Sequence, residues 1–162
     1  MTKRILFVRL PYFPTERFAK ANRRIHSHQK PWWDVQASDE IDDSFDETSP
    51  FVLVLNGAKG TRISAVNQHA HHEGLWPDMK LADARTIVPH IRVEKHDLGA
   101  DEIALNALAH WMLRYSPCVA VDEDYSLALE ITGCAHLFGG EKAMANDIAK
   151  RFARNGYSTR IA

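Results

Sequence analysis

The chain has 162 residues, of which 45% are hydrophobic and 25% charged, a composition typical of a globular protein that can bury a core. Lysine and arginine number 20 against 21 aspartates and glutamates, so the net charge is -1, and the overall basic charge typical of nucleic-acid-binding domains is missing. No stretch has the roughly 18 apolar residues of a membrane span, and the N-terminus lacks a secretory signal pattern. We expect a cytoplasmic protein without a membrane partner, in which any DNA contact comes from a local patch.

The first 50 residues predict a strand, a short helix and an acidic loop. Residues 5–8 form a continuous apolar run, which is typical of a strand buried on both faces. After a proline-rich turn, Thr15 is a candidate cap for a helix that continues to Arg24. Residues 34–49 are acidic and rich in turn formers, so we expect a solvated loop there.

The middle of the chain predicts a hairpin followed by two helices. Residues 51–55 and 61–65 flank a glycine-containing turn and predict paired strands. Helical patterns follow at residues 66–73, before Gly74, and at residues 80–87, before Pro89.

The last third predicts helix, hairpin, helix and strand. Residues 101–115 place their apolar side chains at helical spacing; they are Ile103, Ala107, Leu108, Trp111, Met112 and Tyr115. Residues 118–121 and 127–132 predict a hairpin in which Leu127, Leu129 and Ile131 point inward. A helix over 141–155 and a strand from Tyr157 complete the pattern. This order predicts an α+β fold with a small antiparallel sheet and helices on one face.

Cys118 and Cys134 match neither a CxxC site nor a disulfide framework, and their apolar neighbours predict buried, reduced thiols.

Several stretches resemble the Y-family (UmuC/DinB-type) translesion DNA polymerases, in the order found in that superfamily. They are residues 6–13, 64–75, 82–89, 115–132 and 156–162. Within the superfamily, the run ITGCAHLFGGE at residues 131–141 is similar to the ImuB subgroup, as are LADAR at 81–85 and RYSP at 114–117. The resemblance implies a ferredoxin-like palm with a small fingers-like insertion, and the chain then looks like an N-terminal fragment. The implied parts are a first palm strand and helix (1–30), an acidic loop insertion (31–50), a fingers-like subdomain (51–90) and a palm truncated at its C-terminal end (91–162).

The resemblance also indicates where catalysis would take place. Y-family polymerases hold two Mg²⁺ ions with carboxylates from the first palm strand and the central hairpin, because hard divalent ions need anionic oxygen ligands. Here the strand positions fall on Arg9 and Pro11, and the hairpin positions fall on Tyr125 and Ser126. The nearby Asp122 and Glu123 reach the hairpin positions only if the hairpin shifts by three residues, which would also exchange its two faces. We therefore expect no catalytic residues, no metal site and no cofactor.

The nucleotide-binding side differs as well. The family's tyrosine and arginine that contact the triphosphate fall on Gln68 and His71, and the aromatic residue that screens the sugar falls on Pro14. The loss of an arginine removes charge-assisted, often bidentate, contacts to phosphate. His69, His71 and His72 are spaced so that they spread over different helix faces, which favours a solvated face over a zinc site.

Three functions remain open. The first is a non-catalytic adaptor in DNA-damage-induced (SOS) mutagenic translesion synthesis and DNA repair. For this adaptor the resemblance implies an error-prone C-family DNA polymerase, an ImuA-type RecA-like protein and the sliding clamp as partners, bound mostly through regions outside these residues, with weak binding to damaged DNA or primer-template. The second is an active polymerase that uses Mg²⁺ with Asp122, Glu123 and a recruited carboxylate such as Glu16 or Glu130. The third is a regulatory protein-interaction module that has lost DNA binding.

Overall fold

The computed structural model describes residues 3–28 and 48–162 and divides the chain into two compact units. One consists of residues 1–13 and 97–162 and contains a four-stranded sheet, and the other consists of residues 14–96 and contains a three-stranded sheet. We call them the four-stranded unit and the three-stranded unit, and we describe each by itself. The acidic loop predicted over residues 34–49 lies largely outside the described residues.

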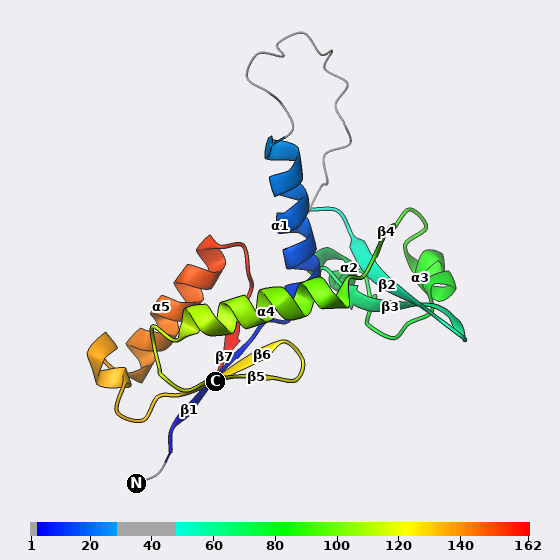
Figure 1. Cartoon of the computed structure of the whole chain (residues 1–162). Coiled ribbons are helices and arrows are strands. Elements are labelled where there is room, and N and C mark those ends of the chain that lie inside the picture. The colour runs from blue at the N-terminus through cyan, green and yellow to red at the C-terminus, as the bar shows by residue number, and fades with distance from the viewer. Residues whose placement is uncertain (1–2, 29–47) are drawn as a thin grey trace, which may run out of the picture. The chain divides into compact units, whose positions relative to one another are not determined.

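The four-stranded unit is an antiparallel sheet in the order β5-β6-β1-β7 (Figure 1). Its strands are β1 (Ile5–Arg9), β5 (Val119–Asp122), β6 (Ser126–Glu130) and β7 (Arg160–Ile161). Its helices are α4 (Leu98–Met112), η1 (Ala135–Phe138) and α5 (Glu141–Arg154). The α+β class, the second hairpin and the last helix are confirmed.

The core of this unit lies between one face of the sheet and the helices. Inward residues alternate along β1 and β6, and Leu127 and Leu129 are fully buried as predicted. They meet apolar side chains of α4 and α5, among them Leu105, Met112, Met144, Ile148 and Phe152. Ile5 and Phe7 are 50% and 42% exposed, so the expectation of a strand buried on both faces is wrong. An antiparallel sheet can bury one face and leave the other exposed to solvent. Here the helices bury Leu6 and Val8, which alternate with the exposed Ile5 and Phe7.

Helix α4 begins earlier than predicted and buries a different stripe. Asp97 caps it, because its Oδ1 accepts a hydrogen bond from the backbone N–H of Ala100 at 3.0 Å. Ile103 was predicted to face inward but is 74% exposed. The buried stripe contains Asp101 and Leu105. Asp101 can occupy a core position because its carboxylate accepts a hydrogen bond from Tyr125, and a search for apolar residues does not reveal such a position.

The three-stranded unit has the strand order β3-β2-β4 (Figure 1). Its elements are α1 (Phe13–His28), β2 (Phe51–Gly57), β3 (Gly60–Val66), α2 (Gln68–His72), α3 (Leu81–Ile87) and β4 (Arg92–Lys95). The β2–β3 hairpin is confirmed. Strand β4 was not predicted, and it pairs in parallel with β2, whereas the sequence placed residues from 91 onward with the palm.

Both faces of the three-stranded sheet are covered by apolar side chains. Val52, Ile63 and Val66 pack with Ala70 of α2 and Ala84 of α3, and on the other face Phe51 and Leu53 pack against Phe18 of α1.

Two local expectations need correction. Thr15 is not the cap of α1 but lies inside its first turn, where its buried hydroxyl donates to the backbone carbonyl of Val66 at 3.3 Å. Cys118 is exposed and Cys134 is partly buried, so the expectation of buried thiols is wrong for Cys118, which precedes an edge strand. Among the described residues, no helix is both long and apolar enough to cross a membrane.

Candidate functional site

The sheet of the four-stranded unit brings the predicted site positions of β1 and β6 together. The strand register places Arg9 opposite Ser126, and Ser126 opposite Asp122 on β5. Directly opposed residues of antiparallel strands project from the same face, so these three side chains form one cross-strand row. Pro11 follows in the turn after β1 and is half-buried.

Tyr125 occupies an uncommon backbone conformation in the β5–β6 turn. Both Tyr125 and Asp124 have positive φ angles, 56° and 54°, which are rare for residues other than glycine. Three contacts hold Tyr125 in this conformation. Its carbonyl accepts a hydrogen bond from Leu10 N–H at 3.0 Å, its hydroxyl donates to the Asp101 carboxylate at 3.2 Å, and its ring centroid lies 5.5 Å from that of Phe13. The side chain at this position is therefore anchored in the unit.

Asp101 is a site residue that the sequence analysis missed. It lies in the first turn of α4 and is 2% exposed, and a buried carboxylate is stable only with hydrogen-bond donors nearby. The Tyr125 hydroxyl is one such donor. The only available signal was its position four residues before Leu105 on the buried stripe of α4.

The guanidinium of Arg9 carries positive charge into the cross-strand row. It lies 3.8 Å from the carboxylate of Asp124, and both side chains are largely exposed. An exposed ion pair of this kind adds little stability. Its local effect is electrostatic, because a cation opposes the binding of a divalent metal ion beside it.

Carboxylates gather next to the row without forming a metal site. Asp101, Glu102, Asp122 and Asp124 line a surface pocket of about 400 Å³ together with Leu98, Leu105 and Tyr125. Glu123 is exposed outside this lining, and its N–H donates to Asp122 Oδ1 at 2.9 Å. Within residues 3–28 and 48–162, no three histidine, cysteine, aspartate or glutamate side chains are grouped so that they could hold a metal ion.

Two further carboxylates were considered for the site, Glu130 and Glu16. Glu130 pairs with Ile5 at the opposite end of β6 from Ser126, and its carboxylate lies 3.6 Å from Lys3 Nζ. Glu16 belongs to α1, in the three-stranded unit.

The two positions predicted to contact the triphosphate lie in the three-stranded unit, on α2. Asn67 caps this helix by accepting a hydrogen bond from Ala70 N–H at 2.8 Å. Gln68 and His71 are both exposed, and the His71 ring meets Trp76 edge-on with centroids 5.9 Å apart. Pro14 is buried in the first turn of α1, where a helix tolerates proline.

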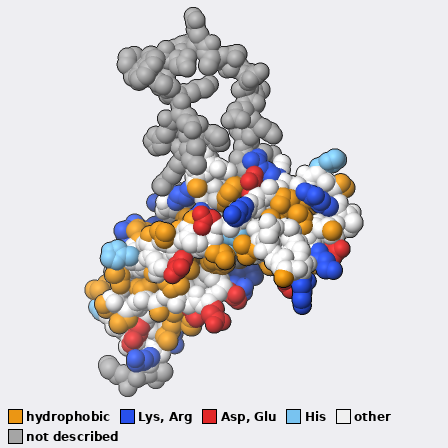
Figure 2. Space-filling model, turned by 45° about the vertical axis from the view of Figure 1, so that its right-hand side comes forward, with side chains coloured by type: hydrophobic (Ala, Val, Ile, Leu, Met, Phe, Trp, Pro, Cys, Tyr) orange, Lys and Arg blue, Asp and Glu red, His pale blue; other side chains and the backbone are white. Residues whose placement is uncertain are grey.

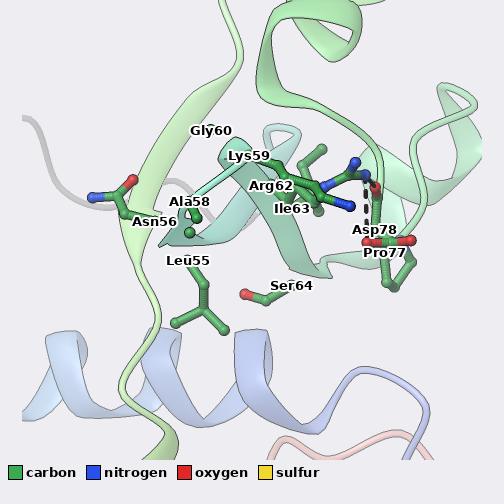
Figure 3. A pocket seen from close by; sticks show the side chains of 11 residues that line it. Leu55, Asn56, Ala58, Lys59, Gly60, Arg62, Ile63, Ser64, Pro77 and Asp78 are labelled. Carbon is green, nitrogen blue, oxygen red and sulfur yellow. Dashed lines mark hydrogen bonds and ion pairs between the residues drawn. The ribbon is translucent and has the colours of Figure 1, made fainter.

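A second pocket opens beside the β2–β3 turn. It has a volume of about 530 Å³ and is lined by residues 55–60, 62–64, 77 and 78. Figure 3 shows Arg62 directed at Asp78, where its Nη1 donates to the backbone carbonyl at 2.6 Å. The same Nη1 lies 3.5 Å from Asp78 Oδ1, so the Asp78 carboxylate compensates the charge of Arg62 in this pocket.

The ITGCAHLFGGE run is hydrogen-bonded to Arg4, the residue before β1. Arg4 N–H donates to the Thr132 hydroxyl at 2.9 Å, and the Arg4 guanidinium makes two hydrogen bonds to the Glu141 carboxylate. The hydrogen bonds from the Arg4 guanidinium lower the pKa of the Glu141 carboxyl.

The buried phenol of Tyr115, which follows the end of α4, is hydrogen-bonded to α5. The Tyr115 hydroxyl donates to the Asp147 carboxylate at 2.5 Å. Burial, followed by this bond, raises the pKa of Tyr115 to about 12, and the hydrogen bond from Tyr115 is the largest cause of the lowered pKa of Asp147. The phenol is therefore neutral and donating throughout the physiological range.

The surface charge is mixed. Figure 2 shows lysine and arginine side chains interspersed with aspartate and glutamate on the face that it displays. This distribution agrees with the net charge of -1.

Comparison with known proteins identifies the family. The sequence model of the IMS family, described as impB/mucB/samB, matches residues 35–162. The chain belongs to the impB/mucB/samB family of Y-family polymerase homologues. The resemblance seen in the sequence is thereby confirmed.

Curated relatives point to the same subgroup. Protein ImuB from two strains of Caulobacter vibrioides, NA1000 / CB15N and ATCC 19089 / CIP 103742 / CB 15, is 49% identical over 89 residues. The match covers 55% of this chain but 19% of the ImuB proteins, so it spans about a fifth of their length.

Solved structures confirm the predicted fold. The insertion ternary complex of Dbh DNA polymerase has a TM-score of 0.73 at 13% identity, covering 98% of this chain and 41% of that chain. DinB from Sulfolobus solfataricus has a TM-score of 0.69 at 13% identity with the same coverage. At this identity the likeness establishes the fold and leaves the activity open.

Proposed function

We propose that this chain is part of a non-catalytic Y-family polymerase homologue that acts as an adaptor in DNA-damage-induced mutagenic translesion synthesis and DNA repair. The observation that carries the proposal is the cross-strand row in which Arg9 lies opposite Ser126, next to a Tyr125 side chain bound to Asp101. According to the family resemblance, Arg9, Tyr125 and Ser126 stand where the family places metal ligands.

The chemistry of these side chains supports the absence of catalysis. Phosphoryl transfer by two metal ions needs carboxylates that bridge both ions and neutralise their charge. Arg9 supplies a positive charge, Pro11 supplies no side-chain ligand, and Ser126 supplies a neutral hydroxyl. The Tyr125 phenol donates a hydrogen bond to Asp101 and supplies no carboxylate. Replacing one of these four residues by a carboxylate would leave the other three unsuitable as metal ligands.

The proposed adaptor role assigns partner binding to the whole protein. The proposed partners are an error-prone C-family DNA polymerase, an ImuA-type RecA-like protein and the sliding clamp, and the proposed location is the cytoplasm. The similarity to ImuB proteins supports this reading. Since the match spans about a fifth of those proteins, we place most partner contacts outside it. We propose weak binding to damaged DNA or primer-template, in keeping with the mixed surface charge.

An active polymerase is the competing proposal. It is favoured by the four carboxylates around the pocket next to Tyr125, of which Asp122 is one. It would require Asp122 and Glu123 to converge with a third carboxylate, although the Glu123 side chain lies outside the pocket and Glu130 lies at the far end of β6.

Primer extension separates the two proposals. The full-length protein is incubated with primer-template, nucleotides and Mg²⁺ or Mn²⁺, with Dbh DNA polymerase as the positive control. We expect no templated incorporation under conditions in which Dbh extends the primer. Extension that disappears in Asp122→Ala would establish the active polymerase instead.

The adaptor role needs a cellular test. In the organism that encodes the protein, deletion of its gene is expected to abolish damage-induced mutagenesis. The double variant Asp122→Ala, Glu123→Ala is expected to retain it, because the proposal gives these carboxylates no catalytic role. Induced mutagenesis that survives the deletion would contradict the adaptor role.

A further inference from the structure

The outer edge of β5 is open to pairing. In the sheet order β5-β6-β1-β7, β5 is an end strand, and within the described ranges its only strand neighbour is β6. Cys118 accepts a hydrogen bond from Glu130 N–H at 3.0 Å across this ladder. Because antiparallel pairs alternate, the backbone N–H and C=O groups of Val119 and Val121 then point away from β6.

This edge has few of the features that usually protect an edge strand: it is short and ends in an aspartate, but it has no lysine, proline or bulge. Natural edges carry lysine, proline or a bulge, which discourage the addition of another strand. The β5 sequence is Val-Ala-Val-Asp, its register with β6 is regular, and its last three residues are exposed. Val121 is 43% exposed although it points to the core face. The edge therefore offers backbone hydrogen bonds and apolar contact together.

Charge at the end of β5 selects the kind of strand that fits. Asp122, the last residue of β5, lines the pocket of about 400 Å³ with Glu102 and with Asp124, which also pairs with Arg9 at 3.8 Å. Leu98 and Leu105 also line it, so the pocket suits a side chain with an aliphatic stem and a cationic head. The same carboxylates repel nucleic-acid phosphates, which favours a protein ligand over DNA at this position.

We propose that the outer edge of β5 and this pocket form a docking site for an extended basic segment of a protein partner. The segment adds a strand beside β5 through the backbone of Val119 and Val121, and it places a lysine or arginine side chain in the pocket. Strand addition of this kind obtains affinity from backbone bonds and specificity from side-chain pockets. The proposal goes beyond the adaptor function and does not depend on the absence of catalysis.

Fluorescence anisotropy with a labelled peptide tests the site on this chain. The probe is a short peptide of alternating valine and lysine, and its matched control alternates valine and glutamate. We expect binding of the first peptide only. The double variant Glu102→Gln, Asp124→Asn is expected to weaken binding by about threefold to tenfold, from two partly exposed ion pairs. Glu123→Gln, which removes a charge from the same turn but outside the pocket, is the control and is expected to bind normally.

Two further measurements test the edge itself. Val121→Pro removes an N–H that points outward, which an edge strand tolerates, and it is expected to abolish peptide binding. If this variant fails to fold, hydrogen exchange on the unaltered chain replaces it. The amides of Val119 and Val121 are expected to exchange fast in the free protein and to become protected by the valine–lysine peptide.

Several results would overturn the proposal. These are equal binding of both peptides, no binding of either, or Val119 and Val121 amides that stay unprotected under saturating peptide. Concentration-dependent dimerisation in light scattering that Val121→Pro removes would assign the edge to a second copy of the chain and would equally contradict a basic peptide partner.

Discussion

Replacing Asn67 by alanine is expected to destabilise the three-stranded unit strongly. The Asn67 side chain accepts hydrogen bonds from Ala70 N–H at 2.8 Å and Phe51 N–H at 3.1 Å, and it donates to the Ser49 carbonyl at 2.9 Å. Loss of the cap costs about 1 kcal/mol, and a buried backbone N–H without a partner costs about 1–3 kcal/mol. We therefore expect the free energy of unfolding to fall by about 2–4 kcal/mol.

Hydrogen exchange is the suitable assay, because two units need not unfold together and a single denaturation curve would mix them. Exchange of the core amides of β2 and β3 reports the opening free energy of this unit in Asn67→Ala. The control is Asn56→Ala, which removes an exposed side chain that accepts one bond from Thr61 and is expected to change stability by less than about 0.5 kcal/mol. Similar opening free energies in the two variants would refute the role given to Asn67.

Two further predictions concern the four-stranded unit. Because the pKa of Tyr115 is raised to about 12 from 10.0, the neutral phenol stabilises the fold fully below about pH 10, and this contribution is lost as pH rises toward 12. Melting temperatures across this range are expected to fall less in Tyr115→Phe, and parallel curves would contradict the assignment. Leu129→Ala, at a fully buried position, is expected to lower the opening free energy that hydrogen exchange gives for the β1 and β6 amides by about 2–5 kcal/mol, whereas Leu137→Ala, at a 74% exposed position, is expected to be nearly neutral; equal losses would contradict the packing.

Periodicity in the sequence was sufficient to predict the elements whose buried face follows from their own residues. The alternation of Leu127, Leu129 and Ile131 matched the buried face of β6, and the glycine-bounded pattern of α5 matched its helix. Periodicity failed where a polar residue is buried or where a strand pairs at long range. Asp101 shifted the buried stripe of α4, and β4, with one valine among charged residues, depends on its parallel pairing with β2.

The candidate site depended on the family resemblance more than on pattern. No spacing rule indicates that Arg9 lies opposite Ser126, because that contact is created by the sheet topology. The Tyr125–Asp101 bond and the Arg4–Glu141 contact were missed for the same reason, since each joins residues from separate elements. The positions of Gln68 and His71 on α2 were predicted, and their proposed loss of triphosphate contacts remains a prediction.

Binding of Mn²⁺ to this chain, followed by paramagnetic broadening of backbone amide signals, tests the central claim most directly. We predict no saturable broadening centred on Arg9, Asp122 and Ser126 at Mn²⁺ concentrations that saturate Dbh DNA polymerase measured in parallel, because the row holds a guanidinium and a hydroxyl opposite each other. Saturable broadening at these three residues that is lost in Asp122→Ala would show that the hairpin holds a catalytic-type metal ion, and would contradict the account.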